Sequence, residues 1–241
     1  GISMTADVPT LDQRRRAVRF SNIGHFYSHL FMLLYPTVVL ALEEEFNRSY
    51  GELLALALPG FVLFGIAALP AGWLGDKWSA PNMFTIFFLG TGAAAILTGL
   101  ATTALELGAG LTLIGLMNAI YHPVGTSLIV RHAANRARAL AANGVWGTMG
   151  IALAAVISGA LTDVAGWRAA FVVPGVVCLA TGVLFRLLVA REALETGGAR
   201  TRLDPGVSRR QAVHGLAILA ITILCIGLIA QSLQVGMPKM F

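Results

Sequence analysis

Long apolar runs limit the fold that this sequence can adopt. They cover roughly residues 20–42, 52–73, 82–102, 107–130, 142–162, 168–190 and 213–235. Each is long enough to cross the hydrocarbon core of a bilayer as a helix, which takes about 20 apolar residues. Only 12% of the residues are charged, against about 25% in a typical soluble domain. The alternating pattern of a membrane β-barrel is absent, so the sequence predicts an all-α membrane protein.

The basic residues between these runs give the orientation. With the N-terminus placed in the cytoplasm, every Lys and Arg except Arg48, Arg168 and Lys239 falls on the cytoplasmic side. This bias follows the positive-inside rule. The net charge of +5 is then explained by topology and by contact with anionic lipid headgroups, not by nucleic-acid binding. We expect a multi-pass protein of a bacterial-type inner (plasma) membrane with a cytoplasmic N-terminus.

A polar, charged stretch at residues 191–212 marks the clearest boundary in the chain. We expect residues 1–19 to be a cytoplasmic tail and residues 20–190 to form a six-helix bundle. Residues 191–212 are then a cytoplasmic linker, and residues 213–241 a seventh transmembrane helix. An even bundle followed by one further helix is typical of the first half of a longer protein, with that helix opening a second bundle.

Two of the apolar runs carry polar side chains at helical spacing. In the first run these are Ser21, His25, Ser28, His29 and Met32, which share one helix face. In the fourth run they include Asn118 and His122, and Pro123 predicts a bend in that helix. An ionisable side chain is costly in lipid, so these faces are expected to turn toward protein or water.

Histidine is the side chain in these runs that can exchange a proton near neutral pH, because no Asp or Glu lies in the middle of any run. One hypothesis is that His122, helped by His25 or His29, couples a proton to an anionic or polar solute. The alternative is that these histidines are hydrogen-bonded packing residues.

A metal site is a rival hypothesis. His25 and His29 are four residues apart and can hold one ion, while the thioether of Met32 adds a soft ligand for copper or iron. The acidic residues Glu43, Glu44 and Glu45 could concentrate cations at the outer mouth.

Several motifs resemble those of the major facilitator superfamily. Gly72-Trp73-Leu74-Gly75-Asp76-Lys77 resembles the Gly-x-x-x-Asp-(Arg/Lys) loop that follows its second helix. Gly166-Trp167-Arg168-Ala169-Ala170-Phe171 is similar to the Trp-Arg-x-x-Phe entry to its sixth helix. Tyr121-His122-Pro123 looks most like the branch of fosmidomycin-resistance-type exporters.

The resemblance implies two six-helix bundles, each made of inverted three-helix repeats, which rock around a central substrate site. The first and fourth helices then line the cavity. The expected solute- or proton-binding residues are His25, His29, Asn118, Tyr121, His122, Asn143 and Trp146. The expected gating residues are Gly72, Asp76, Lys77, Arg131 and Arg138.

The sequence also departs from the family pattern. After Lys77 it continues Trp78-Ser79-Ala80 in place of the usual Gly-Arg-(Arg/Lys), and the fifth run lacks the Gly-Pro pair of antiporters. The motifs therefore do not carry an antiport mechanism.

The sequence favours a secondary active transporter of a small solute that works by alternating access. A transition-metal transporter and a non-transporting accessory or assembly protein of a membrane complex remain as alternatives. No HExxH, GxSxG or phosphate-binding glycine loop is present, so we expect neither an enzyme nor a cofactor. The expected partners are a small-molecule or ion substrate, membrane lipids, and a second bundle or a second copy of the chain.

Overall fold

The computed structural model describes residues 10–189, and beyond them residues 208, 210, 211, 213–215, 217, 218 and 221. The chain divides into two compact units, residues 1–198 and 199–241. Most of the expected linker and seventh helix lies outside the described residues. The described part of the first unit is helical and contains no strand, so the predicted all-α class is confirmed.

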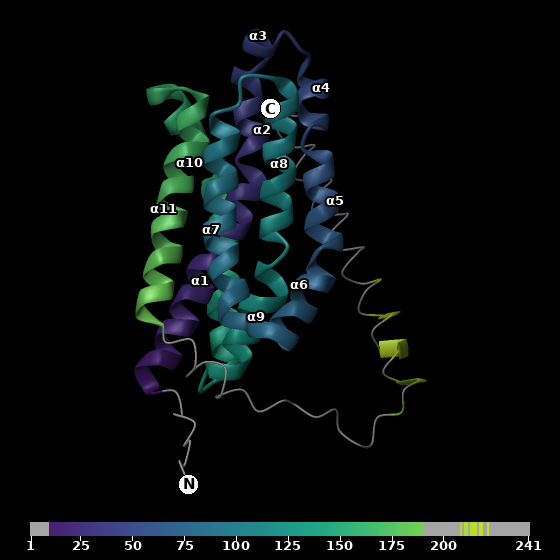
Figure 1. Cartoon of the computed structure of the whole chain (residues 1–241), viewed down its shortest axis with the longest axis vertical. Helices are drawn as coiled ribbons and strands as arrows, with labels where there is room; N and C mark the ends of the chain where they lie inside the picture. The colour runs from purple at the N-terminus through teal and green to yellow at the C-terminus, as the bar shows by residue number, and fades with distance from the viewer. Residues whose placement is uncertain are drawn as a thin grey trace. The chain divides into compact units, whose positions relative to one another are not determined.

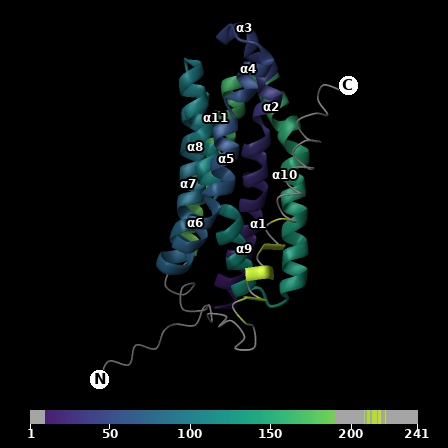
Figure 2. The same cartoon turned by 90° about the vertical axis from the view of Figure 1, so that its right-hand side faces the viewer.

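The helices of the first unit run up and down side by side (Figures 1 and 2). Their bounds are α1 (Leu11–Leu33), α2 (Tyr35–Val38), η1 (Val39–Ala41), α3 (Glu43–Phe46), α4 (Tyr50–Ala55), α5 (Leu58–Ile66), α6 (Ala68–Leu74), the π-helical turn η2 (Gly75–Ser79), α7 (Ala80–Gly99), α8 (Ala104–Asn118), α9 (Tyr121–His132), α10 (Arg136–Ala165) and α11 (Trp167–Leu188).

Within the described residues, 5 helical segments are long and apolar enough to span a membrane. They are Leu11–Ala41, Ala68–Gly99, Ala104–His132, Arg136–Ala165 and Trp167–Leu188, and a shorter apolar helix covers Tyr50–Ile66. The run expected at 52–73 is therefore divided: α4, α5 and α6 share it, and η2 joins α6 to α7 without a long loop.

Local side-chain chemistry explains where the helices begin. Thr10 and Thr103 form capping boxes with Gln13 and Glu106 at the starts of α1 and α8. The side chain of Asn135 accepts a hydrogen bond from the backbone of Arg138 and starts α10.

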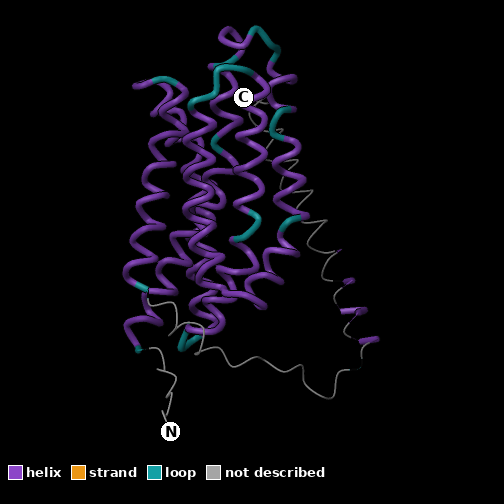
Figure 3. Tube along the Cα trace, viewed as in Figure 1, coloured by secondary structure: helices purple, strands orange, loops and turns teal. Residues whose placement is uncertain are grey.

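The predicted bend at Pro123 is present as a break in the helix. α8 ends at Asn118 and α9 begins at Tyr121, and Figure 3 shows the break as a short loop inside the bundle. Pro123 has no backbone N–H and cannot extend the hydrogen-bond ladder of α8 through this point. The side chain at the start of α9, His122, is thereby separated from the face of α8.

Close helix packing depends on glycine. A Cβ atom added to Gly92 of α7 would lie 2.6 Å from the carbonyl oxygen of Gly175 in α11, which is closer than real contacts allow. Beside this approach, the ring of Phe84 packs against Phe88 and Phe185, with centroids 4.9 and 5.2 Å apart. Between membrane helices such packing supplies much of the attraction, because lipid tails are as apolar as the side chains.

A polar contact links α3 to the start of α11, at the end of the bundle opposite the N-terminus (Figure 1). Arg168 Nη2 lies 2.8 Å from Glu45 Oε1, and Trp167 Nε1 donates to Glu45 Oε2 at 2.6 Å. Burial by itself would raise the pKa of Glu45, but the hydrogen bonds from Arg168 and Trp167 and the charge of Arg168 outweigh it and lower that pKa.

We expect Glu45→Gln to destabilise the protein at pH 7 by less than about 1 kcal/mol, because the ion pair is largely solvated. A carboxyl whose pKa is lowered on folding stabilises the protein above its unfolded pKa of about 4.3 and loses that contribution as the pH falls through the folded value. Thermal unfolding in detergent should therefore separate variant and wild type at pH 7, and the difference should shrink as the pH falls below about 4. Exposed Glu44→Gln is the control, and an equal shift from it would refute the pairing.

Candidate functional site

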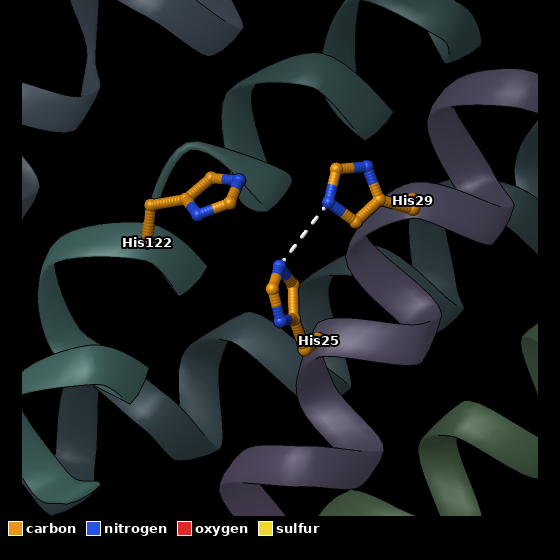
Figure 4. A group of neighbouring side chains, drawn as sticks. All are labelled: His25, His29 and His122. Atoms are coloured by element: carbon orange, nitrogen blue, oxygen red, sulfur yellow. Dashed lines mark hydrogen bonds between the residues drawn. The ribbon is translucent and has the colours of Figure 1, made fainter. Parts of the chain in front are cut away.

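Three histidines from two helices converge inside the bundle. His25 and His29 lie on α1, near the middle of the Leu11–Ala41 span, and His122 lies at the start of α9. Figure 4 shows the three rings turned toward one another. Each offers a ring nitrogen, and these nitrogens all lie within 4.8 Å of one another.

Hydrogen bonds define the protonation pattern of the pair on α1. His25 Nδ1 lies 2.8 Å from the backbone oxygen of Asn143. A carbonyl oxygen only accepts, so in the neutral ring Nδ1 carries the proton and Nε2 carries a free lone pair. His29 Nε2 lies 3.2 Å from that atom (Figure 4) and donates its own N–H to it. One hydrogen bond thus joins the two rings, and an added proton or a bound ion would change it.

Tyr121 and Asn143 form a buried layer behind His25. The Tyr121 ring stacks on the His25 ring, with centroids 4.9 Å apart and planes 19° apart. Its hydroxyl donates to the backbone oxygen of Ser21 at 3.0 Å and accepts from Asn143 Nδ2 at 2.9 Å. Asn143 Nδ2 also donates to Asn22 Oδ1. These contacts join α1, α9 and α10 around His25 and fix its orientation.

Two apolar positions complete the surroundings of the rings. A Cβ atom on Gly147 of α10 would lie 2.6 Å from His25 Cε1, so only glycine leaves room for the imidazole. The Phe64 ring of α5 lies edge-on to His122, with centroids 5.7 Å apart. The sequence showed Gly147 only as one of several glycines in its run, and no pattern identified Phe64.

The surroundings of the other expected residues differ from one another. Asn118 is completely buried at the end of α8, and neither polar atom of its side chain has a hydrogen-bond partner among the described residues. Trp146 is 37% exposed. Met32 lines a separate small cavity with Tyr35 and Phe61.

The expected gating residues separate into two groups. Arg131 Nη2 of α9 lies 2.7 Å from Asp76 Oδ1 of η2, and Gly72 of α6 packs against Pro123 of α9. Lys77 is exposed. Arg138 instead borders a cavity of about 550 Å³ that is lined also by Arg14, Arg15, Arg19 and His132.

Solved structures with a similar fold are transporters. A bacterial homologue of the human lysosomal transporter Spinster, in an inward-facing and unoccupied conformation, has a TM-score of 0.65 and 16% identity over 82% of this chain and 46% of its own. A peptide transporter of the POT type in complex with alafosfalin has a TM-score of 0.57 and 19% identity, over 91% of this chain and 45% of its own. An auto-inhibited POT-family peptide transporter has a TM-score of 0.56 and 20% identity, over 93% and 51%.

This chain therefore spans about half the length of these transporters. No curated protein sequence gives a significant match. The model of the Major Facilitator Superfamily matches residues 23–240. With that match over nearly all of its sequence and the same fold in its structural neighbours, the chain belongs to the major facilitator superfamily of membrane transporters.

Proposed function

We propose that this chain supplies half of the solute site of a secondary active transporter, in which membrane histidines bind a small polar or anionic solute together with a proton. The observation that carries the proposal is the convergence of His25, His29 and His122 within 4.8 Å. Ionisable side chains at such depth are costly unless they face a pathway or one another.

The cluster suits joint binding of a proton and an anion. Among the described residues no carboxylate belongs to it, and the uncharged rings share one hydrogen bond. One added proton gives the cluster a positive charge. A bound anion stabilises that charge, so proton and solute favour each other's binding.

The short helix α9 provides a physical link between this site and the gate. It carries His122 at its start and Arg131 in its last turn, and Arg131 pairs with Asp76. In the proposed cycle, separating Arg131 from Asp76 frees the end of α9, and the resulting shift repositions His122. Alternating access in this fold is largely a rocking of one bundle against the other around a fixed site.

We expect His122→Gln to weaken the pH dependence of transport, because an amide cannot take up a proton in this range while His25 and His29 still can. The test is flux in liposomes that contain the full-length protein, across pH 5.5–8 in roughly half-unit steps. The transported solute is the one that most raises the melting temperature in a thermal-shift screen.

The matched control is His214→Gln, since His214 is exposed and belongs to the second compact unit of the chain. If the His122→Gln variant keeps the wild-type flux and its pH dependence, the proton role of His122 is refuted, irrespective of the result for the control.

For the gate, we expect Asp76→Asn to change the rate of transport by no more than about fivefold, because an exposed ion pair contributes about 1 kcal/mol or less. The swap Asp76→Arg with Arg131→Asp should restore the rate better than either single substitution does, since it recreates the pair. Initial rates for the wild type, both single variants and the swap form a double-mutant cycle. Additive effects in that cycle would show that the contact does not act as a gate.

A further inference from the structure

We propose that the cluster of His25, His29 and His122 is a binding site for one divalent transition-metal cation of the Zn²⁺ class. The ligands are Nε2 of His25, Nε2 of His29 and one ring nitrogen of His122, and the proton that His29 Nε2 donates to His25 in the metal-free pair moves to Nδ1 of His29. Metal binding at these atoms stands on geometry alone. That such a cation is also transported is a further statement, which rests on the transporter family of the chain and makes the cation an alternative to the polar or anionic solute of the proposed function.

The spacing of the nitrogens fits a metal ion. In a tetrahedral site with Zn–N bonds of about 2.0–2.1 Å, neighbouring ligand nitrogens are about 3.3–3.4 Å apart. His25 Nε2 and His29 Nε2 are 3.2 Å apart, and the three ligand atoms lie within 4.8 Å. A shift of the His122 ring by about 1.5 Å would therefore close the site. A pair of histidines on one helix turn is common, but a third from another helix is what makes a chelating site.

The atoms around the pair on α1 resemble the support that metal ligands receive. A ligating histidine usually donates its other ring N–H to a carbonyl or carboxylate, which fixes the tautomer and the ring plane. His25 does this through Nδ1 to the backbone oxygen of Asn143 at 2.8 Å. The stacked Tyr121 ring and the bare Cα of Gly147 hold the imidazole from its two neighbouring helices. The Nε2 lone pair is thus presented toward His29 and His122.

The donor set selects the class of ion. Imidazole suits Zn²⁺, Cu²⁺, Ni²⁺ and Fe²⁺, whereas Mg²⁺ and Ca²⁺ require oxygen ligands. Three neutral ligands leave a fourth position for water or an anion, which accommodates the same small anions as the proton-loaded cluster.

Metal and protons must compete at this site. Metal binding needs unprotonated ring nitrogens and releases any protons that they hold. Among the described residues, the titratable groups that face the cluster are the three histidines themselves and Tyr121, while α10 and α5 contribute uncharged Asn143 and Phe64. Metal affinity should therefore fall as the pH is lowered.

The test is direct titration of the full-length protein, purified in detergent with any histidine tag removed, using Co²⁺ alone as the probe. One Co²⁺ per chain with the intense visible bands of a tetrahedral site is the expected result. His25→Ala, His29→Ala and His122→Ala should each weaken binding by at least about 100-fold, because each removes a direct ligand. His214→Ala, which removes a histidine outside the cluster, should leave it unchanged.

A measurement on the wild-type protein tests the site without relying on alanine variants, which could lose metal binding by misfolding. Diethyl pyrocarbonate modifies accessible imidazoles, and mass spectrometry locates the modified residues. Zn²⁺ should protect His25, His29 and His122 but not His214. Binding that survives His122→Ala in a folded protein, or a lack of protection by Zn²⁺, would overturn the proposal.

The transport role is tested separately, by Zn²⁺ flux into liposomes that contain the same protein. If Co²⁺ binds at the three histidines but no Zn²⁺ moves, the site stands and the cation is not the transported solute. If Co²⁺ does not bind while solute flux still depends on pH through His122, the metal inference is wrong and the proposed function stands.

Discussion

A polar group inside a bilayer is costly without a partner in the protein, and the contacts of His25 supply such partners across three helices. Its ring donates to the backbone of α10 at Asn143, receives a hydrogen bond from His29 and stacks on Tyr121 of α9. The Tyr121 hydroxyl in turn reaches the backbone of α1 at Ser21. Three helices are thus joined by contacts that would each leave an unsatisfied group in an apolar surrounding if broken.

The same network explains why glycine and a helix break occur where they do. Gly147 lets α10 approach closely enough for the Asn143 carbonyl to meet His25. The break between Asn118 and Tyr121 starts a new helix whose first residues, Tyr121 and His122, both turn toward α1. A continuous helix through Pro123 would need a backbone donor that proline lacks. The irregular backbone at this break lies against protein, because unpaired backbone N–H and C=O groups would be costly in lipid.

Sequence periodicity predicted some parts of this arrangement but not others. Run lengths predicted the membrane helices, and the four-residue spacing predicted that His25 and His29 share a face. Loop and helix-entry motifs predicted the family. The approach of His122 to that pair depends on how α1 and α9 pack, which no local pattern encodes. Spacing along one helix likewise predicted a common face for Asn118 and His122, and the structure has a helix break between these two residues.

The short helix α9 connects the histidine cluster to the Asp76–Arg131 pair, so the two cannot move independently. α9 is only 12 residues long, and Gly72 and Gly75 pack directly against Pro123 and Val124 near its start. Because a close-packed interface is not continuously deformable, α9 cannot slide along α6 without moving His122 relative to His25 and His29. A ligand that binds all three imidazoles therefore fixes α9 against α1. In the proposed cycle, the cost of separating the Asp76–Arg131 pair then depends on whether the three rings are bridged.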